Sequence, residues 1–157
     1  MNNKNIITNI KKRAEYLEKI RKYFKGLNTL EVDTPLAYTY GVTDPFIDVF
    51  VIDTVAGKRY LQSSPECAMK RLLAAGTGSI YQICKAFRDE PCGHQHNPEF
   101  TMIEWYRVGI DYFQLMQEME NLFLAFKSDI EFIYLSYQEA FEKYCGFNPH
   151  KTFLGEL

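Results

Sequence analysis

The sequence has few cysteines, no long apolar run and no excess of charge, and each shortage excludes a class of protein. Its four cysteines show no C-x-x-C spacing, which indicates reduced thiols rather than a disulfide framework. No apolar run approaches the roughly 20 residues of a membrane-spanning helix, and the first residues lack the apolar core of a signal peptide. We therefore expect a cytoplasmic protein without a membrane partner.

The near balance of charge argues against nucleic acid as the main partner. Eighteen lysines and arginines stand against twenty aspartates and glutamates, a net charge of -2. Proteins that bind nucleic acid normally carry a basic patch or a strongly basic domain. The 157 residues and the 46% hydrophobic content instead indicate one domain, residues 1–157, with a single buried core.

Hydrophobic periodicity predicts both helices and strands. Apolar residues recur every three or four positions in four segments, predicted as helices over residues 10–25, 64–75, 112–127 and 136–145. Alternating segments predict strands over residues 29–35, 46–53, 79–90 and 99–109. Turns between adjacent strands are too short for helical crossovers, so the pattern favours an α+β fold with a mostly antiparallel sheet flanked by helices.

The segment from Phe87 to Arg107 reads as a hairpin whose two faces differ in chemistry. Alternation puts Ile103 and Trp105 on an apolar face that suits the core. The opposite face carries Arg88, Glu90, Phe100, Met102, Glu104 and Tyr106. A guanidinium, an aromatic ring and a carboxylate beside a phenol suit a phosphate, a base and an ammonium group. The same alternation also fits a wetted sheet face with cross-strand ion pairs.

Longer segments of the sequence resemble a known family. "FRDE" followed by "HNPEFTMIEWY" closely resembles motif 2 of class II aminoacyl-tRNA synthetases, in the form found in lysyl-tRNA synthetases and the short ligases that modify elongation factor P. "RAEYLEKIRKYFKGLNTLEVDTP" resembles motif 1, and "LQSSPECAMKRLLAAGTGSIYQICKAFRDE" is similar to the short ligases. The resemblance runs roughly from Ile10 to Pro149 and implies the catalytic-core fold of this class.

The resemblance implies a role for each candidate site residue. Arg88 would be catalytic and would hold the α-phosphate of ATP and the carboxylate of the amino acid. The other ATP contacts would be Asp89, Glu90, His96, Asn97 and Phe100. The pocket for the amino acid would comprise Ser64, Pro65, Glu66, Glu104 and Tyr106. Asp89 replaces the amide that is usual in the family, which weakens that one contact.

Each of these roles has a plainer structural alternative. Arg88 could form a surface salt bridge, Phe100 could be a core ring, and Glu66 could serve only the helix dipole. Glu104 and Tyr106 could form a hydrogen-bonded pair with no ligand. Cys92, His94 and His96 alternate and could offer zinc three ligands, but no fourth ligand is evident, so we predict no metal site.

The resemblance also implies partners and points to missing parts. No segment matches motif 3 or the acids before it that usually bind Mg²⁺, so we expect a core truncated before motif 3 that lacks those ligands. No anticodon-binding domain precedes the first helix, which favours elongation factor P over tRNA. The implied activity is ATP-dependent activation of lysine or β-lysine as an adenylate, in a homodimer formed through motif 1. The alternatives are a non-catalytic dimeric paralogue that binds a ligand or protein, and a lysyl-tRNA synthetase fragment.

Overall fold

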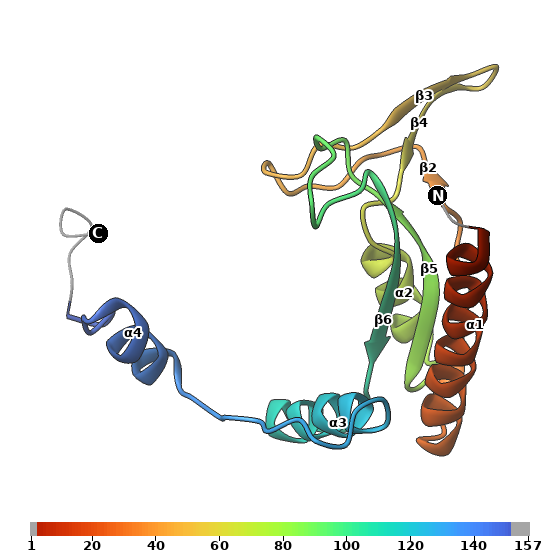
Figure 1. Ribbon diagram of the computed structural model, residues 1–157. Coiled ribbons are helices and arrows are strands. Elements are labelled where there is room, and N and C mark those ends of the chain that lie inside the picture. The colour runs from red at the N-terminus through yellow and green to blue at the C-terminus, as the bar shows by residue number, and fades with distance from the viewer. Residues whose placement is uncertain (1–2, 152–157) are drawn as a thin grey trace.

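A computed structural model describes residues 3–151 as four helices and six strands (Figure 1). The helices are α1 (Asn3–Gly26), α2 (Glu66–Ala74), α3 (Tyr112–Leu124) and α4 (Tyr137–Cys145). The strands are β1 (Leu30–Glu31), β2 (Ala37–Tyr38), β3 (Val51–Thr54), β4 (Gly57–Leu61), β5 (Ile80–Phe87) and β6 (Glu99–Tyr106). All four predicted helices are confirmed, and α1 begins before the apolar repeat that predicted it. None of these helices is long and apolar enough to cross a membrane.

The strands form two sheets of three strands each. The first has the order β1-β5-β6, in which β1 is parallel to β5 and β5 is antiparallel to β6. The second has the order β2-β4-β3 and is antiparallel throughout. The predicted α+β class with mostly antiparallel pairing is therefore confirmed. β1 is shorter than predicted, because only Leu30 and Glu31 have ladder partners on β5.

The core forms where α1 runs alongside the long β5-β6 hairpin (Figure 1). Phe24 is fully buried, and its ring stacks on Tyr81 with the centroids 4.5 Å apart. Ile103 and Trp105 pack against this cluster, as their positions on β6 predicted. Because these two side chains point into the core, alternation sends Glu104 and Tyr106 to the opposite face of β6.

A largely buried ion pair joins the end of the hairpin to α3. Arg107 Nε donates to Glu118 Oε1 at 2.7 Å, and the two side chains are only 15% and 13% exposed. Arg107 Nη1 also donates to the Leu27 carbonyl at 3.2 Å and to Thr29 Oγ1 at 2.9 Å. One guanidinium thus links α3 to the segment that follows α1.

The last helix lies away from both sheets, at the end of an extended segment (Figure 1). α4 buries none of its residues. Its boundaries nevertheless follow the predicted local signals, because Ser136 and Glu139 form a reciprocal capping box and Gly146 adopts a left-handed conformation with φ 80°. Local sequence therefore defines this helix without support from a packed core.

Candidate functional site

A carboxylate held by two hydroxyl groups lies where the start of α2 meets β6. Glu104 Oε2 accepts from Ser64 Oγ at 2.7 Å, and Glu104 Oε1 accepts from Tyr106 Oη at 2.6 Å. Ser64 Oγ in turn accepts from the backbone N–H of Glu66 at 3.0 Å. Both carboxylate oxygens are thereby oriented, and the position of Ser64 is set by the first turn of α2.

Glu104 forms no ion pair within residues 3–151, where the ion pairs involve other acids. Burial and the hydrogen bond to Glu104 raise the pKa of Tyr106 far above its usual range, so the phenol remains a donor. A partly buried carboxylate without a counter-charge is costly. The cluster therefore favours a cationic group supplied by a ligand.

Arg88 lies between two hollows. The larger, of about 670 Å³, is lined by Arg88 together with Ser64, Glu66 and Glu104. The smaller, of about 250 Å³, is lined by Arg88, Glu90, Gln95, His96, Asn97 and Phe100. Arg88 is the residue common to both hollows, so one guanidinium can contact a ligand that occupies the two together.

The guanidinium of Arg88 is only partly satisfied by its surroundings. Its central carbon lies 5.4 Å from the centroid of the Phe100 ring. Its Nε atom is buried and has no hydrogen-bond partner in the described part of the chain. Because Arg88 lines both hollows, its guanidinium suits an anionic oxygen such as that of a phosphate or carboxylate.

The structure brings together all but one of the predicted nucleotide contacts. Asp89 is exposed and lines neither hollow, and its backbone N–H donates to the Asp48 carbonyl at 2.9 Å. The prediction that Arg88 and Glu90 lie within the hairpin strand is wrong, because β5 ends at Phe87. The backbone N–H of Arg88 still donates to the Pro98 carbonyl at 2.9 Å, which holds it beside the entry to β6.

The predicted amino-acid contacts divide into three groups. Ser64, Glu66 and Glu104 line the larger hollow, whereas Tyr106 acts through its hydrogen bond to Glu104. Pro65 is buried at the N-cap position of α2, where it makes no side-chain capping hydrogen bond, and it lines neither hollow. The carboxylate of Glu66 pairs with Lys70 one turn later, at 2.5 Å. This pair occupies Glu66 Oε1, so a ligand cation would meet the carboxylate at its other oxygen or compete with Lys70.

Sequence reasoning missed two parts of the site. Gln95 lines the smaller hollow, and the loop of residues 42–47 closes one side of the larger one. Within this loop, Asp44 Oδ1 accepts from the backbone N–H of Phe46 at 2.9 Å, a turn that the Thr-Asp-Pro sequence could have indicated. A loop has no periodicity, so its place over the hollow had no signal in the pattern of residues.

The described residues do not offer a metal site. No group of three His, Cys, Asp or Glu side chains within residues 3–151 could hold a metal ion, and this includes the trio Cys92, His94 and His96. The positive group that the two hollows do offer to a phosphate is the guanidinium of Arg88.

Known proteins resemble this chain over nearly its whole length. The family described as tRNA synthetases class II (D, K and N) matches residues 1–155. A protein of Pseudoalteromonas translucida named "Elongation factor P--(R)-beta-lysine ligase" is 45% identical over an alignment of 157 positions that covers 96% of this chain and 48% of that protein. A protein with the same name from Edwardsiella ictaluri is 46% identical over an alignment of 160 positions that covers 96% of this chain and 49% of the relative. The chain spans about half the length of the curated relatives it matches.

Proposed function

Because this chain belongs to the class II tRNA synthetases of the D, K and N type, we propose that it activates a lysine-type amino acid with ATP and passes it to elongation factor P. The name shared by the relatives supports (R)-β-lysine as the amino acid and elongation factor P as the acceptor. The observation that carries the proposal is the place of Arg88, between the hollow that contains Glu104 and the hollow that contains Phe100.

The first step joins the two ligands at Arg88. A carboxylate oxygen of the amino acid attacks the α-phosphorus of ATP, which forms a mixed anhydride and releases pyrophosphate. Arg88 can hold the carboxylate and the α-phosphate together, which replaces a chance encounter by a fixed geometry. Its positive charge also stabilises the charge that builds on the phosphoryl oxygens.

The two hollows divide the recognition of the ligands. Glu104, oriented by Ser64 and Tyr106, binds an ammonium group of the amino acid. Phe100 offers its ring to the adenine, beside Asn97 and His96. In the second step an amine of elongation factor P attacks the carbonyl carbon of the anhydride, which forms an amide and releases AMP.

Titration calorimetry with a non-hydrolysable β-lysyl-adenylate analogue tests this function. Arg88→Lys keeps the charge but loses the two-pronged geometry of the guanidinium, so we expect at least about tenfold weaker binding. Arg59→Lys on β4 is the matched control, because Arg59 lines neither hollow. The proposal is wrong if the parent chain does not bind the analogue, or if Arg88→Lys binds it as tightly as the parent.

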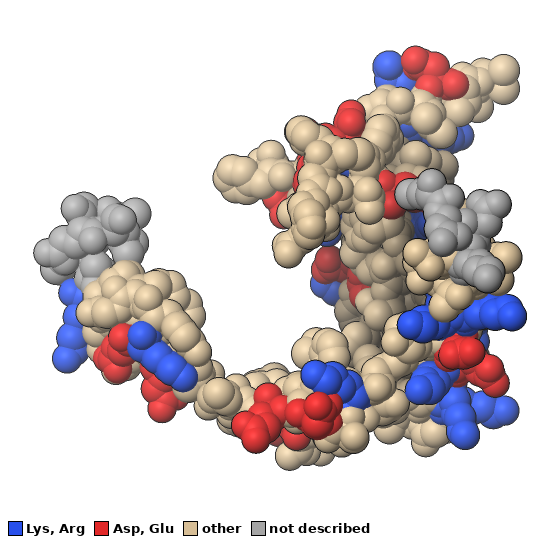
Figure 2. All heavy atoms as spheres, in the orientation of Figure 1, with Lys and Arg blue, Asp and Glu red and all other residues tan. Residues whose placement is uncertain are grey.

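We also propose that two copies associate through α1 and that the protein works in the cytoplasm. Support for the dimer comes from Ile6, Ile7 and Ile10, which are 42%, 56% and 63% exposed near the start of α1. Figure 2 shows lysines and arginines gathered over the lower part of α1. Since two such basic surfaces would repel each other, the apolar first turns suit the contact better.

A further inference from the structure

The loop of residues 42–47 brings a second carboxylate without a counter-charge to the larger hollow. Asp44 lines this hollow together with Glu66, Arg88 and Glu104. Asp44 is exposed and forms no ion pair within residues 3–151. The hollow therefore has an acid besides Glu104 that is not engaged in an ion pair of the described chain.

A tight turn orients the side chain of Asp44. Its Oδ1 atom accepts from the backbone N–H of Phe46 at 2.9 Å, and its carbonyl accepts from the backbone N–H of Ile47 at 3.3 Å. Aspartate followed by proline favours such a turn, because the aspartate bonds the backbone two residues on and the proline ring presets φ. The turn thus holds one carboxylate oxygen, and the other can meet a ligand.

The far end of the loop is tied to the segment that carries Arg88. The carbonyl of Asp48 accepts from the backbone N–H of Asp89 at 2.9 Å, and Asp89 directly follows Arg88. Glu104 instead lies two residues before the end of β6. If Arg88 holds the carboxyl group of a substrate, we expect Asp44 to lie near that group and Glu104 to lie farther along the substrate.

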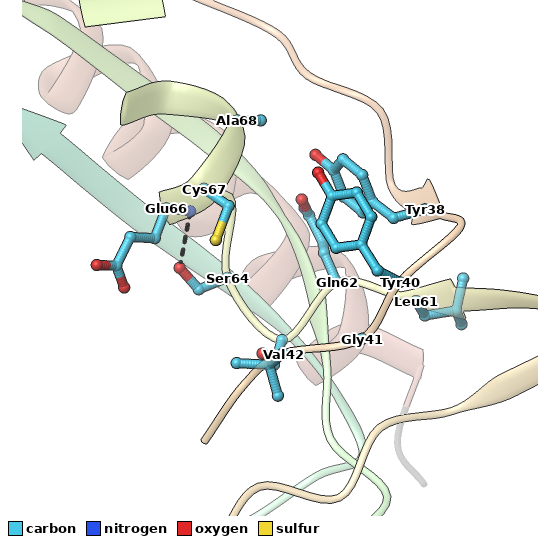
Figure 3. A pocket seen from close by; sticks show the side chains of 11 residues that line it. Tyr38, Tyr40, Gly41, Val42, Leu61, Gln62, Ser64, Glu66, Cys67 and Ala68 are labelled. Carbon is cyan, nitrogen blue, oxygen red and sulfur yellow. Dashed lines mark hydrogen bonds between the residues drawn. The ribbon is translucent and has the colours of Figure 1, made fainter. Parts of the chain in front are cut away.

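Glu66 is the third acid of the hollow, and its charge is already balanced. Ser64 Oγ accepts from the backbone N–H of Glu66 at 3.0 Å, which fixes the start of α2 (Figure 3). The carboxylate of Glu66 extends outward from α2 in the same view and pairs with Lys70. Because Lys70 already neutralises Glu66, Asp44 is the better partner for a second cationic group of a ligand.

The charges around the larger hollow match those of the adenylate of a diamino acid. Asp44 and Glu104 contribute two negative charges and Arg88 one positive charge, a net charge of -1, whereas Glu66 is balanced by Lys70. The adenylate of a diamino acid has one negative charge on its phosphate and two positive charges on its amines. The adenylate of a monoamino acid is neutral overall and would leave one of the two acids without a cation.

We infer that Asp44 selects diamino acids by binding the amine nearer the carboxyl group, while Glu104 binds the terminal amine. This inference rests on the proposed function, in which Arg88 holds the carboxyl group. Because Asp44 is exposed, water and salt screen its attraction for the amine, so its effect on affinity is modest. Asp44 therefore sets a preference among ligands that Arg88 and Glu104 already bind.

Calorimetry with two non-hydrolysable adenylate analogues, β-lysyl and 6-aminohexanoyl, tests this role of Asp44. The second analogue keeps the terminal amine and lacks the amine nearer the carboxyl group. We expect Asp44→Asn to bind the β-lysyl analogue about two- to fivefold more weakly than the parent does, and to bind the 6-aminohexanoyl analogue about equally well. Asparagine keeps an acceptor for the backbone N–H of Phe46, so the turn is preserved.

Two further variants serve as controls. Asp48→Asn removes the same charge nearby, but Asp48 lines neither hollow, so this variant should bind both analogues as the parent does. The contact of Asp48 with Asp89 uses a backbone carbonyl and is kept. Asp44→Ser also removes the charge and keeps an acceptor for the turn, so the test remains decisive even if Asp44→Asn does not fold.

The outcomes separate the role of Asp44 from the proposed function. If the parent binds neither analogue, the proposed function fails and the role of Asp44 fails with it. If the parent binds both analogues equally, or if Asp44→Asn binds the β-lysyl analogue as tightly as the parent, Asp44 does not select the substrate and the proposed function stands. An equal loss of affinity in Asp48→Asn would show an effect of charge at long range and would also overturn the inference.

Discussion

Replacement of Glu104 by glutamine removes one charge from the larger hollow and little else. In the parent, the carboxylate accepts from Ser64 at 2.7 Å and from Tyr106 at 2.6 Å. In Glu104→Gln, the amide oxygen can accept from Tyr106 while the amide nitrogen donates to Ser64, because a hydroxyl has lone pairs available. The shape of the site is therefore kept, and both contacts remain hydrogen bonds, although the one with Ser64 reverses its direction.

The expected effect falls on binding and spares stability. A hydrogen bond to a charged group contributes about 1.5 to 3 kcal/mol, so the loss of the charge should weaken a lysyl-adenylate analogue roughly 10- to 150-fold. The melting temperature should stay the same or rise, since Glu104 has no cationic partner among the ion pairs of residues 3–151. If Glu104 merely belonged to a wetted sheet face, the substitution would change stability by under about 1 kcal/mol and would affect no ligand.

Calorimetric titration and thermal melts of the parent and the variant decide between these outcomes. A norleucyl-adenylate analogue, which lacks the side-chain amine, should bind both proteins with nearly equal affinity if that amine is the group at Glu104. Glu99→Gln is the matched control, because Glu99 lies on the same strand but pairs with Lys85 at 2.6 Å and lines neither hollow. Equal affinities of the parent and Glu104→Gln for the lysyl analogue would refute the assignment.

Three further predictions concern stability and assembly. Arg107→Met leaves Glu118 largely buried and without its ion-pair partner, so urea unfolding should show a free energy of unfolding lower by about 3 to 5 kcal/mol. The second change Glu118→Leu should restore part of this loss. An unchanged urea midpoint in Arg107→Met would contradict the prediction. Burial and the hydrogen bond to Glu31 raise the pKa of Tyr81 to about 12, so the stability that they confer is complete below pH 10 and is lost as the pH rises toward 12. In Tyr81→Phe, the free energy of unfolding should therefore change less between pH 10 and pH 12 than it does in the parent. The same dependence on pH in both proteins would count against this prediction. Light scattering at high micromolar concentration should show a dimer that Ile10→Glu dissociates, whereas a monomeric parent would exclude the contact through α1.

The sequence by itself determined the features that depend on neighbours along the chain. The capping box of Ser136 and Glu139 and the left-handed Gly146 delimit α4 as predicted, although this helix buries nothing. Alternation along β6 correctly assigned Ile103 and Trp105 to the core, and hence Glu104 to the opposite face. These features were predictable because helix ends and strand faces depend on fixed short spacings in the backbone.

Only the tertiary structure decided which distant residues share a space. It placed Arg88 at the junction of two hollows, turned Asp89 away from both, and set Gln62 and Tyr38 in the walls of a small pocket near the start of α2. Residue spacing cannot predict these contacts, because each depends on how separate elements pack and where a strand ends. Gln62 shows this most directly. Its amide nitrogen donates to the carbonyl of Lys85, 23 positions away along the chain, and this bond fixes where its unpaired oxygen lies.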